Sequence, residues 1–173
     1  MISKMKKGPI KMKILVAYYS FEGNTKYIAE AIAKEIKADI LEIKPEKEVG
    51  TKGFFKYPIG GFQVVFGLKP KLKALDKNPE DYDVIFIGTP TWALNLSPPI
   101  RSFLKQRKIT DKKIALFCCR MGNAGRLFKT YRKLLPDNEI LGEIEFSQPL
   151  TKGKEKDLEE AAKWAKDLIK NIK

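Results

Sequence analysis

Residues 13–25, KILVAYYSFEGNT, join an apolar run directly to a segment with helical periodicity. The apolar run over 13–19 predicts a buried strand, and apolar residues spaced three and four apart predict a helix over 25–37. Between them the chain must turn sharply through a stretch rich in hydroxyl and amide groups. Such a turn predicts an anion site, because the helix's first N–H groups and the positive end of its dipole face it.

The turn supplies groups that a phosphate needs. Ser20, Asn24 and Thr25 carry side-chain donors, and Gly23 lets the backbone come close to a ligand. The turn lacks the G-K-[ST] ending of a nucleotide P-loop and the G-x-G-x-x-G of a dinucleotide site, which argues against both classes. Taken alone, Asn and Thr at a helix start are also ordinary caps, so a plain capped turn stays open as an alternative.

Strand and helix patterns alternate along the rest of the chain. Further strands are predicted at 39–43, 83–88, 113–119 and 139–146, and helices at 98–106, 126–135 and 158–173, with Ser97 as the N-cap of the first of these. This alternation is typical of a parallel sheet with helices on both faces, in which ligands bind beyond the carboxyl ends of the strands. Three connections at such ends carry unusual chemistry: 20–24, 89–98 and 119–125.

Length and composition indicate one domain over 1–173, with 1–12 as a basic extension and the aromatic-rich stretch 45–75 as an ordered insertion with a helical centre. The apolar runs are too short to cross a membrane and no leader pattern is present. Two adjacent cysteines, Cys118 and Cys119, fit a reducing cytoplasm. The chain has no His, so we expect no metal site and no catalytic residue.

The chain is strongly basic. Lys and Arg outnumber Asp and Glu by 34 to 21, which gives a formal charge of +13. Such an excess fits nucleic acid, an anionic membrane or an acidic protein, and it is also typical of a Lys-rich solvated surface. The surplus lies in 1–13, 44–75, 101–113 and 120–139 without an aromatic-interleaved stripe, so nucleic acid is the least favoured partner.

Two motifs at the predicted strand ends make the chain resemble the flavodoxin family. SFEGNT at 20–25 is similar to the family's [ST]-x-x-G-N-T, and GTPTWALNLSPPIRSF at 88–103 is similar to a G-T-P-[VT]-W variant found in bacteria and archaea. The similarity runs from Ile14 to the last helix. It implies a flavodoxin-like three-layer α/β sandwich with a five-stranded parallel sheet of order 2-1-3-4-5 and helices on both faces.

The resemblance also implies one noncovalently bound FMN, with its phosphate on 20–25 and its ring system between 89–96 and 119–124. Trp92 offers a flat face for stacking, although a core tryptophan is the alternative. Arg120 or Met121 would cover the other face, and Arg120 is equally well explained as a solvated side chain. The candidate cofactor-binding residues are Ser20, Glu22, Gly23, Asn24, Thr25, Thr89, Pro90, Thr91, Trp92, Ala93, Leu94, Asn95, Cys119, Arg120, Met121 and Gly122.

We therefore predict a cytoplasmic FMN-binding electron carrier with an acidic redox protein as partner. Nearby Lys charges favour the reduced, anionic flavin, so we expect a less negative potential than in acidic relatives. One alternative is an FMN oxidoreductase of the quinone-reductase or protoporphyrinogen-oxidase type, with 45–75 shaping a substrate pocket. The other is a flavin-free nucleic-acid-binding module. A phospho-acceptor receiver domain is disfavoured, because no acidic pair follows the first strand.

Overall fold

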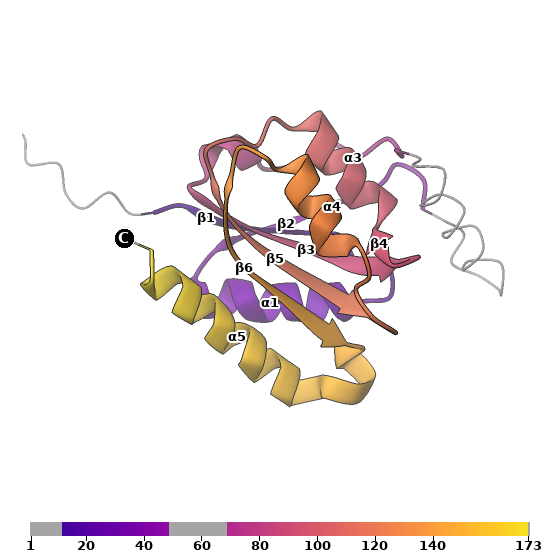
Figure 1. Ribbon diagram of the computed structural model, residues 1–173, viewed down its shortest axis with the longest axis vertical. Coiled ribbons are helices and arrows are strands. Elements are labelled where there is room, and N and C mark those ends of the chain that lie inside the picture. The colour runs from indigo at the N-terminus through magenta and orange to yellow at the C-terminus, as the bar shows by residue number, and fades with distance from the viewer. Residues whose placement is uncertain (1–11, 49–68, 173) are drawn as a thin grey trace, which may run out of the picture.

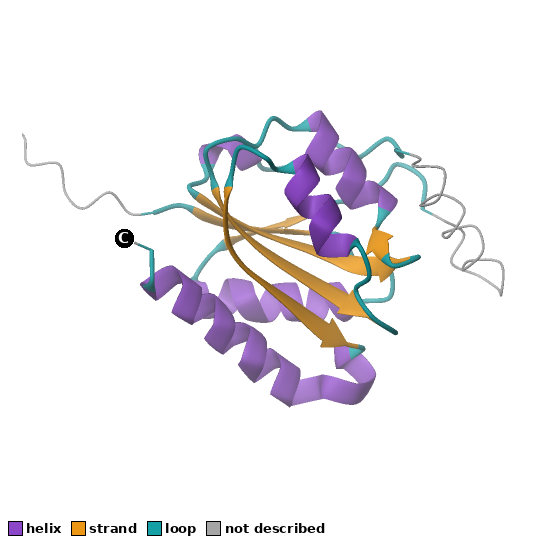
Figure 2. Ribbon diagram, viewed as in Figure 1, coloured by secondary structure: helices purple, strands orange, loops and turns teal. Residues whose placement is uncertain are grey.

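In the computed structural model, which describes residues 12–48 and 69–172, a twisted sheet lies between two pairs of helices (Figures 1 and 2). The strands are β1 (Ile14–Tyr18), β2 (Asp39–Glu42), β3 (Val84–Trp92), β4 (Asn95–Leu96), β5 (Lys113–Arg120) and β6 (Glu139–Ser147). The α-helices are α1 (Asn24–Ile36), α3 (Pro98–Gln106), α4 (Leu127–Leu134) and α5 (Lys154–Lys170), and two short helical turns are η1 (Pro79–Asp81) and η2 (Pro149–Gly153). Most of the predicted basic extension and the centre of the predicted insertion lie outside the described residues.

Five strands run parallel in the order β2-β1-β3-β5-β6, and the two-residue β4 pairs antiparallel with the end of β3. With β4 set aside, this order confirms the predicted 2-1-3-4-5 topology. β2 pairs with one edge of β1, and the chain then crosses over so that β3 pairs with the other edge. The strand order therefore reverses beside β1. Ligands of open α/β sheets bind at the carboxyl ends of the strands next to such a reversal.

Side chains that alternate across the sheet create two hydrophobic cores. Ile85, Ile87 and Leu116 pack under α3 and α4, whereas Phe86 and Phe117 pack against α1 and α5. The period of two along a strand sends successive residues to opposite faces, so α3 and α4 cover one face and α1 and α5 the other (Figure 1).

The two cysteines follow the same alternation. Cys118 lies in the core under α3 and α4 and Cys119 in the opposite core, because successive residues of a strand face opposite sides of the sheet. Both thiols are free and buried. Burial raises the pKa of the Cys118 thiol to about 12, so it is protonated at neutral pH.

Two boundaries differ from the sequence-based predictions, and one predicted capping bond is absent. β3 continues beyond Gly88 to Trp92, because Thr91 and Trp92 pair with Leu96 and Asn95 in a hairpin. Helix α5 starts at residue 154 instead of 158, directly after the unpredicted η2. Helix α3 begins after Ser97 as predicted, but the Ser97 hydroxyl makes no capping bond.

The two ends of the segment 45–75 meet beside the end of β2. Pro45 and Leu72 form an antiparallel bridge, the Glu46 N–H donates to the Lys71 carbonyl at 2.8 Å, and the Lys73 N–H donates to the Lys44 carbonyl at 2.8 Å. We call residues 44–46 and 71–73 the neck. The Tyr19 hydroxyl donates to Glu48 Oε2 at 3.0 Å, which ties the chain just beyond the neck to the residue that follows β1.

Candidate functional site

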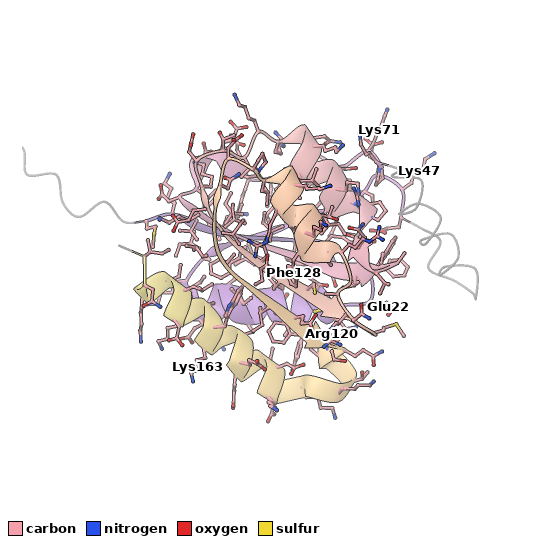
Figure 3. The ribbon with its side chains drawn as sticks, in the orientation of Figure 1. Glu22, Lys47, Lys71, Arg120, Phe128 and Lys163 are labelled. Atoms are coloured by element: carbon pink, nitrogen blue, oxygen red, sulfur yellow. The ribbon has the colours of Figure 1, made fainter. Side chains whose placement is uncertain are left out.

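A cavity of about 400 Å³ lies at the carboxyl ends of β1, β3 and β5, which is within the size range of small-molecule sites. Figure 3 shows two of its lining residues, Glu22 and Arg120, at this edge of the molecule. Three loops and one residue after β6 form its wall. The lining residues are Ser20, Phe21, Glu22, Asn24, Thr25, Pro90, Thr91, Trp92, Ala93, Leu94, Cys119, Arg120, Met121, Gly122, Asn123 and Gln148.

Three of the candidate residues from the sequence do not line this cavity. Gly23 is the N-cap of α1, with a φ of 89°. Thr89 is fully buried, with its hydroxyl 2.8 Å from that of Ser97. Asn95 lies in β4 and accepts a hydrogen bond from the Leu96 N–H at 2.8 Å. These residues shape the loops, whereas the other candidates are brought together at the cavity.

Sequence reasoning missed three lining residues, namely Phe21, Asn123 and Gln148. Phe21 lies inside the turn at 20–25. Its position between a strand and the start of an anion-binding helix could have marked it as a lining residue. Asn123 belongs to a connection already singled out. Gln148 follows β6 and is placed by the unpredicted η2, so no local sequence signal marks it.

The wall of the cavity carries poorly satisfied hydroxyls. The hydroxyls of Ser20, Thr25 and Thr91 are buried without an oxygen or nitrogen partner among the described residues, and Thr25 is only 1% exposed. The weakly bonding thiols of Cys119 and Cys118 lie within reach of Thr25 and Thr91 respectively. A buried unpaired hydroxyl costs about 1–3 kcal/mol, so a ligand oxygen that accepts from these groups recovers that loss. The residues present therefore fit an anionic, oxygen-rich group such as a phosphate.

The start of α1 adds to this anion site. The helix begins at Asn24, and no side chain caps its first N–H groups. Asn24 Oδ1 instead accepts from the Leu150 N–H at 3.1 Å, which ties the turn to η2. The capped-turn alternative is therefore wrong for both Asn24 and Thr25, and the uncapped helix end directs partial positive charge toward the cavity.

An aromatic wall stands beside the anion site. Trp92 packs edge-on against Phe21, with ring centroids 5.4 Å apart and an interplanar angle of 86°, and against Tyr19 at 6.0 Å and 77°. Edge-to-face contacts of this kind hold the indole in one orientation. Trp92 and Phe21 both line the cavity, so Trp92 is not a plain core residue and offers a wall for a planar ligand.

The turn after Trp92 is strained. Ala93 and Leu94 have φ values of 46° and 58°, a geometry that two-residue hairpin turns normally give to Asn and Gly. The Arg126 N–H donates to the Leu94 carbonyl at 2.8 Å and holds the turn in place. A Cβ at Gly125 would lie 2.6 Å from the same carbonyl, so only glycine allows this approach. Strain held by its surroundings is typical of ligand-binding loops.

Arg120 is fixed instead of freely solvated. Its guanidinium forms an ion pair with Glu145 at 2.8 Å and donates to the Gly122 carbonyl, so it braces the loop that follows β5. Met121, at 65% exposed, stands at the cavity mouth. Within the described ranges there is no group of three His, Cys, Asp or Glu side chains that could hold a metal, and no helix there has the length and apolar character to cross a membrane.

The fold and the cavity together define a class of protein: a doubly wound α/β protein that pairs an uncapped helix start with an aromatic wall at its strand-order reversal. A family model described as Flavodoxin matches residues 13–53, which span β1, α1 and β2.

Solved structures agree with this match. A flavoprotein of Lactobacillus acidophilus in complex with FMN is 25% identical, with a TM-score of 0.66, over 78% of this chain and 93% of its own. Flavodoxin 2 of Bacillus cereus (20% identical, TM-score 0.57, 92% and 99% covered) and an azoreductase of Bacillus anthracis (18%, 0.54, 90% and 100%) share the fold. These findings support the assignment of the chain to the flavodoxin family.

Proposed function

We propose that this protein binds FMN in the cavity and carries electrons between redox proteins. The observation that carries the proposal is the set of buried hydroxyls of Ser20, Thr25 and Thr91, which have no oxygen or nitrogen partner among the described residues. They lie in one cavity with the uncapped start of α1 and with Trp92. The similar flavoprotein of Lactobacillus acidophilus was solved with FMN and aligns over nearly its whole length.

Different residues would hold the phosphate and the ring system of the cofactor. Ser20 and Thr25, with the first-turn N–H groups of α1, would hold the phosphate. Trp92 would lie along the ring system, where stacking contributes on the order of 1 kcal/mol beyond burial. Arg120 fixes the loop on the other side through Glu145 and Gly122. Bound FMN supplies reversible one- and two-electron chemistry.

The cavity offers few groups for acid–base catalysis, which favours a carrier. Among the described residues, its ionisable side chains are Glu22, Cys119 and Arg120. Burial raises the pKa of the Cys119 thiol far above its ordinary value, and Arg120 is held in an ion pair. Electron transfer between proteins needs no side chain that gives or takes a proton, so this poor set of groups suits it. The formal charge of +13 favours an acidic partner.

A second candidate is an FMN-dependent oxidoreductase of the quinone-reductase type. The observation in its favour is the pair of exposed apolar side chains at the cavity mouth, Leu94 at 52% and Met121 at 65%. Together they offer a small planar substrate an apolar surface beside the cofactor.

Titration with FMN and with riboflavin, followed by flavin fluorescence, tests the cofactor assignment. We expect one FMN per chain and binding of riboflavin weaker by about 10-fold or more, because riboflavin lacks the phosphate that forms charge-assisted hydrogen bonds. Equal affinity for the two flavins would contradict the phosphate site, and no flavin binding would overturn the proposal.

Two measurements on the FMN-loaded protein separate carrier from enzyme. A carrier is expected to turn over NAD(P)H and a quinone no faster than free FMN does, whereas a quinone reductase turns over steadily. Spectroelectrochemical titration should give a less negative potential than that of an acidic flavodoxin, since nearby cations stabilise reduced flavin. An equal or more negative potential would contradict this electrostatic account.

A further inference from the structure

The two helical layers of this protein differ sharply in charge. Helices α1 and α5 carry seven basic and seven acidic side chains, so their layer has no net charge. On the opposite face, residues 98–108 and 126–134, which contain α3 and α4, carry eight basic side chains and no acidic one. We call these two ranges the basic layer. Its members are Arg101, Lys105, Arg107, Lys108, Arg126, Lys129, Arg132 and Lys133.

The basic layer is poorly neutralised. Among ion pairs between described residues, only that of Arg132 with Glu143, at 2.9 Å, belongs to it. Lys69 and Arg101 lie near Lys105 and lower the pKa of its ammonium group, which is the effect of like charges held close together. An anionic surface laid against this face would relieve that repulsion.

The basic layer reaches the edge of the cavity. Arg126 is the N-cap residue of α4, and its N–H donates to the carbonyl of Leu94, a cavity-lining residue, at 2.8 Å. A protein that covers α3 and α4 is therefore placed next to the cavity mouth, where electrons would enter or leave.

The chemistry of this face favours an acidic protein over nucleic acid. The exposed large hydrophobic residues in the described part of the chain are Leu94, Met121 and Leu150, and none of them is aromatic. Single-stranded nucleic acid binders add exposed aromatic side chains to their basic groove, because bases stack on them. A basic face without such side chains offers charge alone, which suits carboxylates on a protein surface.

We propose that the basic layer is the docking surface for an acidic redox protein. The inference rests on the proposed function, since it names the partner of the same site. The layer on α1 and α5 stays outside the contact and serves as an internal control, with Lys163 exposed on α5 opposite Phe128 of α4 (Figure 3).

Two matched charge reversals on the full chain test this surface. The double variant K105E/K129E changes the basic layer, and K34E/K163E changes α1 and α5 by the same net charge; all four lysines are exposed. Binding of poly-L-glutamate, the probe for an acidic polypeptide, is measured by calorimetry at low and at physiological salt. We expect K105E/K129E to weaken it by about 10-fold or more and K34E/K163E by less than about 2-fold.

Equal losses of affinity for poly-L-glutamate in the two variants would overturn the proposal, because binding would then depend on the net charge of the protein and not on the basic layer. Tighter binding of a single-stranded oligonucleotide than of poly-L-glutamate at the same salt would also overturn it and identify a nucleic-acid surface. An FMN titration of both variants keeps the two proposals apart. Unchanged FMN binding is expected in each, and a protein that binds poly-L-glutamate through the basic layer but no FMN would contradict the proposed function alone.

Discussion

The hydroxyl of Thr25 is buried at the start of α1, where no oxygen or nitrogen of the described residues bonds to it and the weakly bonding Cys119 thiol is within reach. We predict that Thr25→Val leaves the free energy of unfolding unchanged or raises it by about 1 kcal/mol, because valine has nearly the same shape and removes a poorly satisfied polar group. The same variant should bind FMN about 10-fold more weakly and riboflavin as before. Urea unfolding and flavin titration measure the two effects.

Ser102 provides the matched control. Its hydroxyl is also buried without a described partner, but it lies in α3 and does not line the cavity. Ser102→Ala should therefore leave the affinity for both flavins unchanged. If Thr25→Val lowers stability and leaves the ratio of FMN to riboflavin affinity intact, the hydroxyl has a structural role and no part in phosphate binding.

The buried thiols predict a fall in stability at high pH. Folding raises the pKa of Cys118 from an ordinary value of 9.0 to about 12 by burial, and it raises that of Cys119 in the same direction. A raised folded-state pKa contributes stability that is complete below about pH 9 and is lost as the pH rises toward 12. The free energy of unfolding, measured with urea, should fall over this range.

A Cys118→Ala/Cys119→Ala variant isolates that effect. Tyr82 also has its pKa raised to about 12, by burial and its bond to Asp39, so some of the decline will remain in the variant. The decline should nonetheless be shallower than in the parent. An equally steep decline would show that the thiols contribute little. Rapid reaction of the folded parent with a thiol reagent near neutral pH would also contradict their burial.

Among the elements, the β3–β4 hairpin depends on a residue far along the chain. A Cβ at Gly125 would lie 2.6 Å from the Leu94 carbonyl, and Gly125 has a φ of 58°. We predict that Gly125→Ala lowers the free energy of unfolding by about 1–3 kcal/mol and weakens FMN binding, because it displaces the turn beside Trp92. Gly122→Ala is the control for the stability change, since a Cβ there meets nothing within 4 Å. A similar loss of stability in both variants would contradict this account.

The same hairpin shows where prediction from sequence stops. Strands β1 and β5 and helix α1 follow from local periodicity, so the pattern of apolar residues predicts them closely. The hairpin has Ala93 and Leu94 where Asn and Gly would signal a turn, and its geometry is held by Gly125 and Arg126 through contacts remote in sequence. The residue pattern of the hairpin itself gives no indication of these contacts.

Across the whole molecule, the topology and the edge of the sheet at which the cavity lies were predictable, but the residues of its wall were not. Parallel strands bring their carboxyl ends to one edge, so the loops after β1, β3 and β5 had to meet there. Which loop residues face the cavity depends on tertiary packing. Thr89 turns inward to Ser97, whereas Phe21 lines the cavity and contacts Trp92, and neither outcome follows from residue type.

The neck at 44–46 and 71–73 predicts that residues 49–68 are dispensable for folding. Replacing 49–68 with a turn of about four Gly and Ser residues should preserve the far-UV circular dichroism spectrum and FMN binding, because the bonds between the two neck strands remain. A Gly/Ser segment of the original length serves as the control. Loss of cooperative unfolding in the short variant alone would show that the neck cannot close without its natural length.

Because the neck closes the segment with its own backbone bonds, the length of that segment can change without a change in the fold. Doubling a closed loop costs only about 0.6 kcal/mol, so insertions and deletions beyond Glu48 can accumulate while the strand order stays the same. Tyr19 contacts both Trp92 and Glu48, so a change in the chain just beyond the neck can shift Tyr19 and, through it, the aromatic wall. The segment beyond the neck can in this way affect the cavity without any change in the sheet.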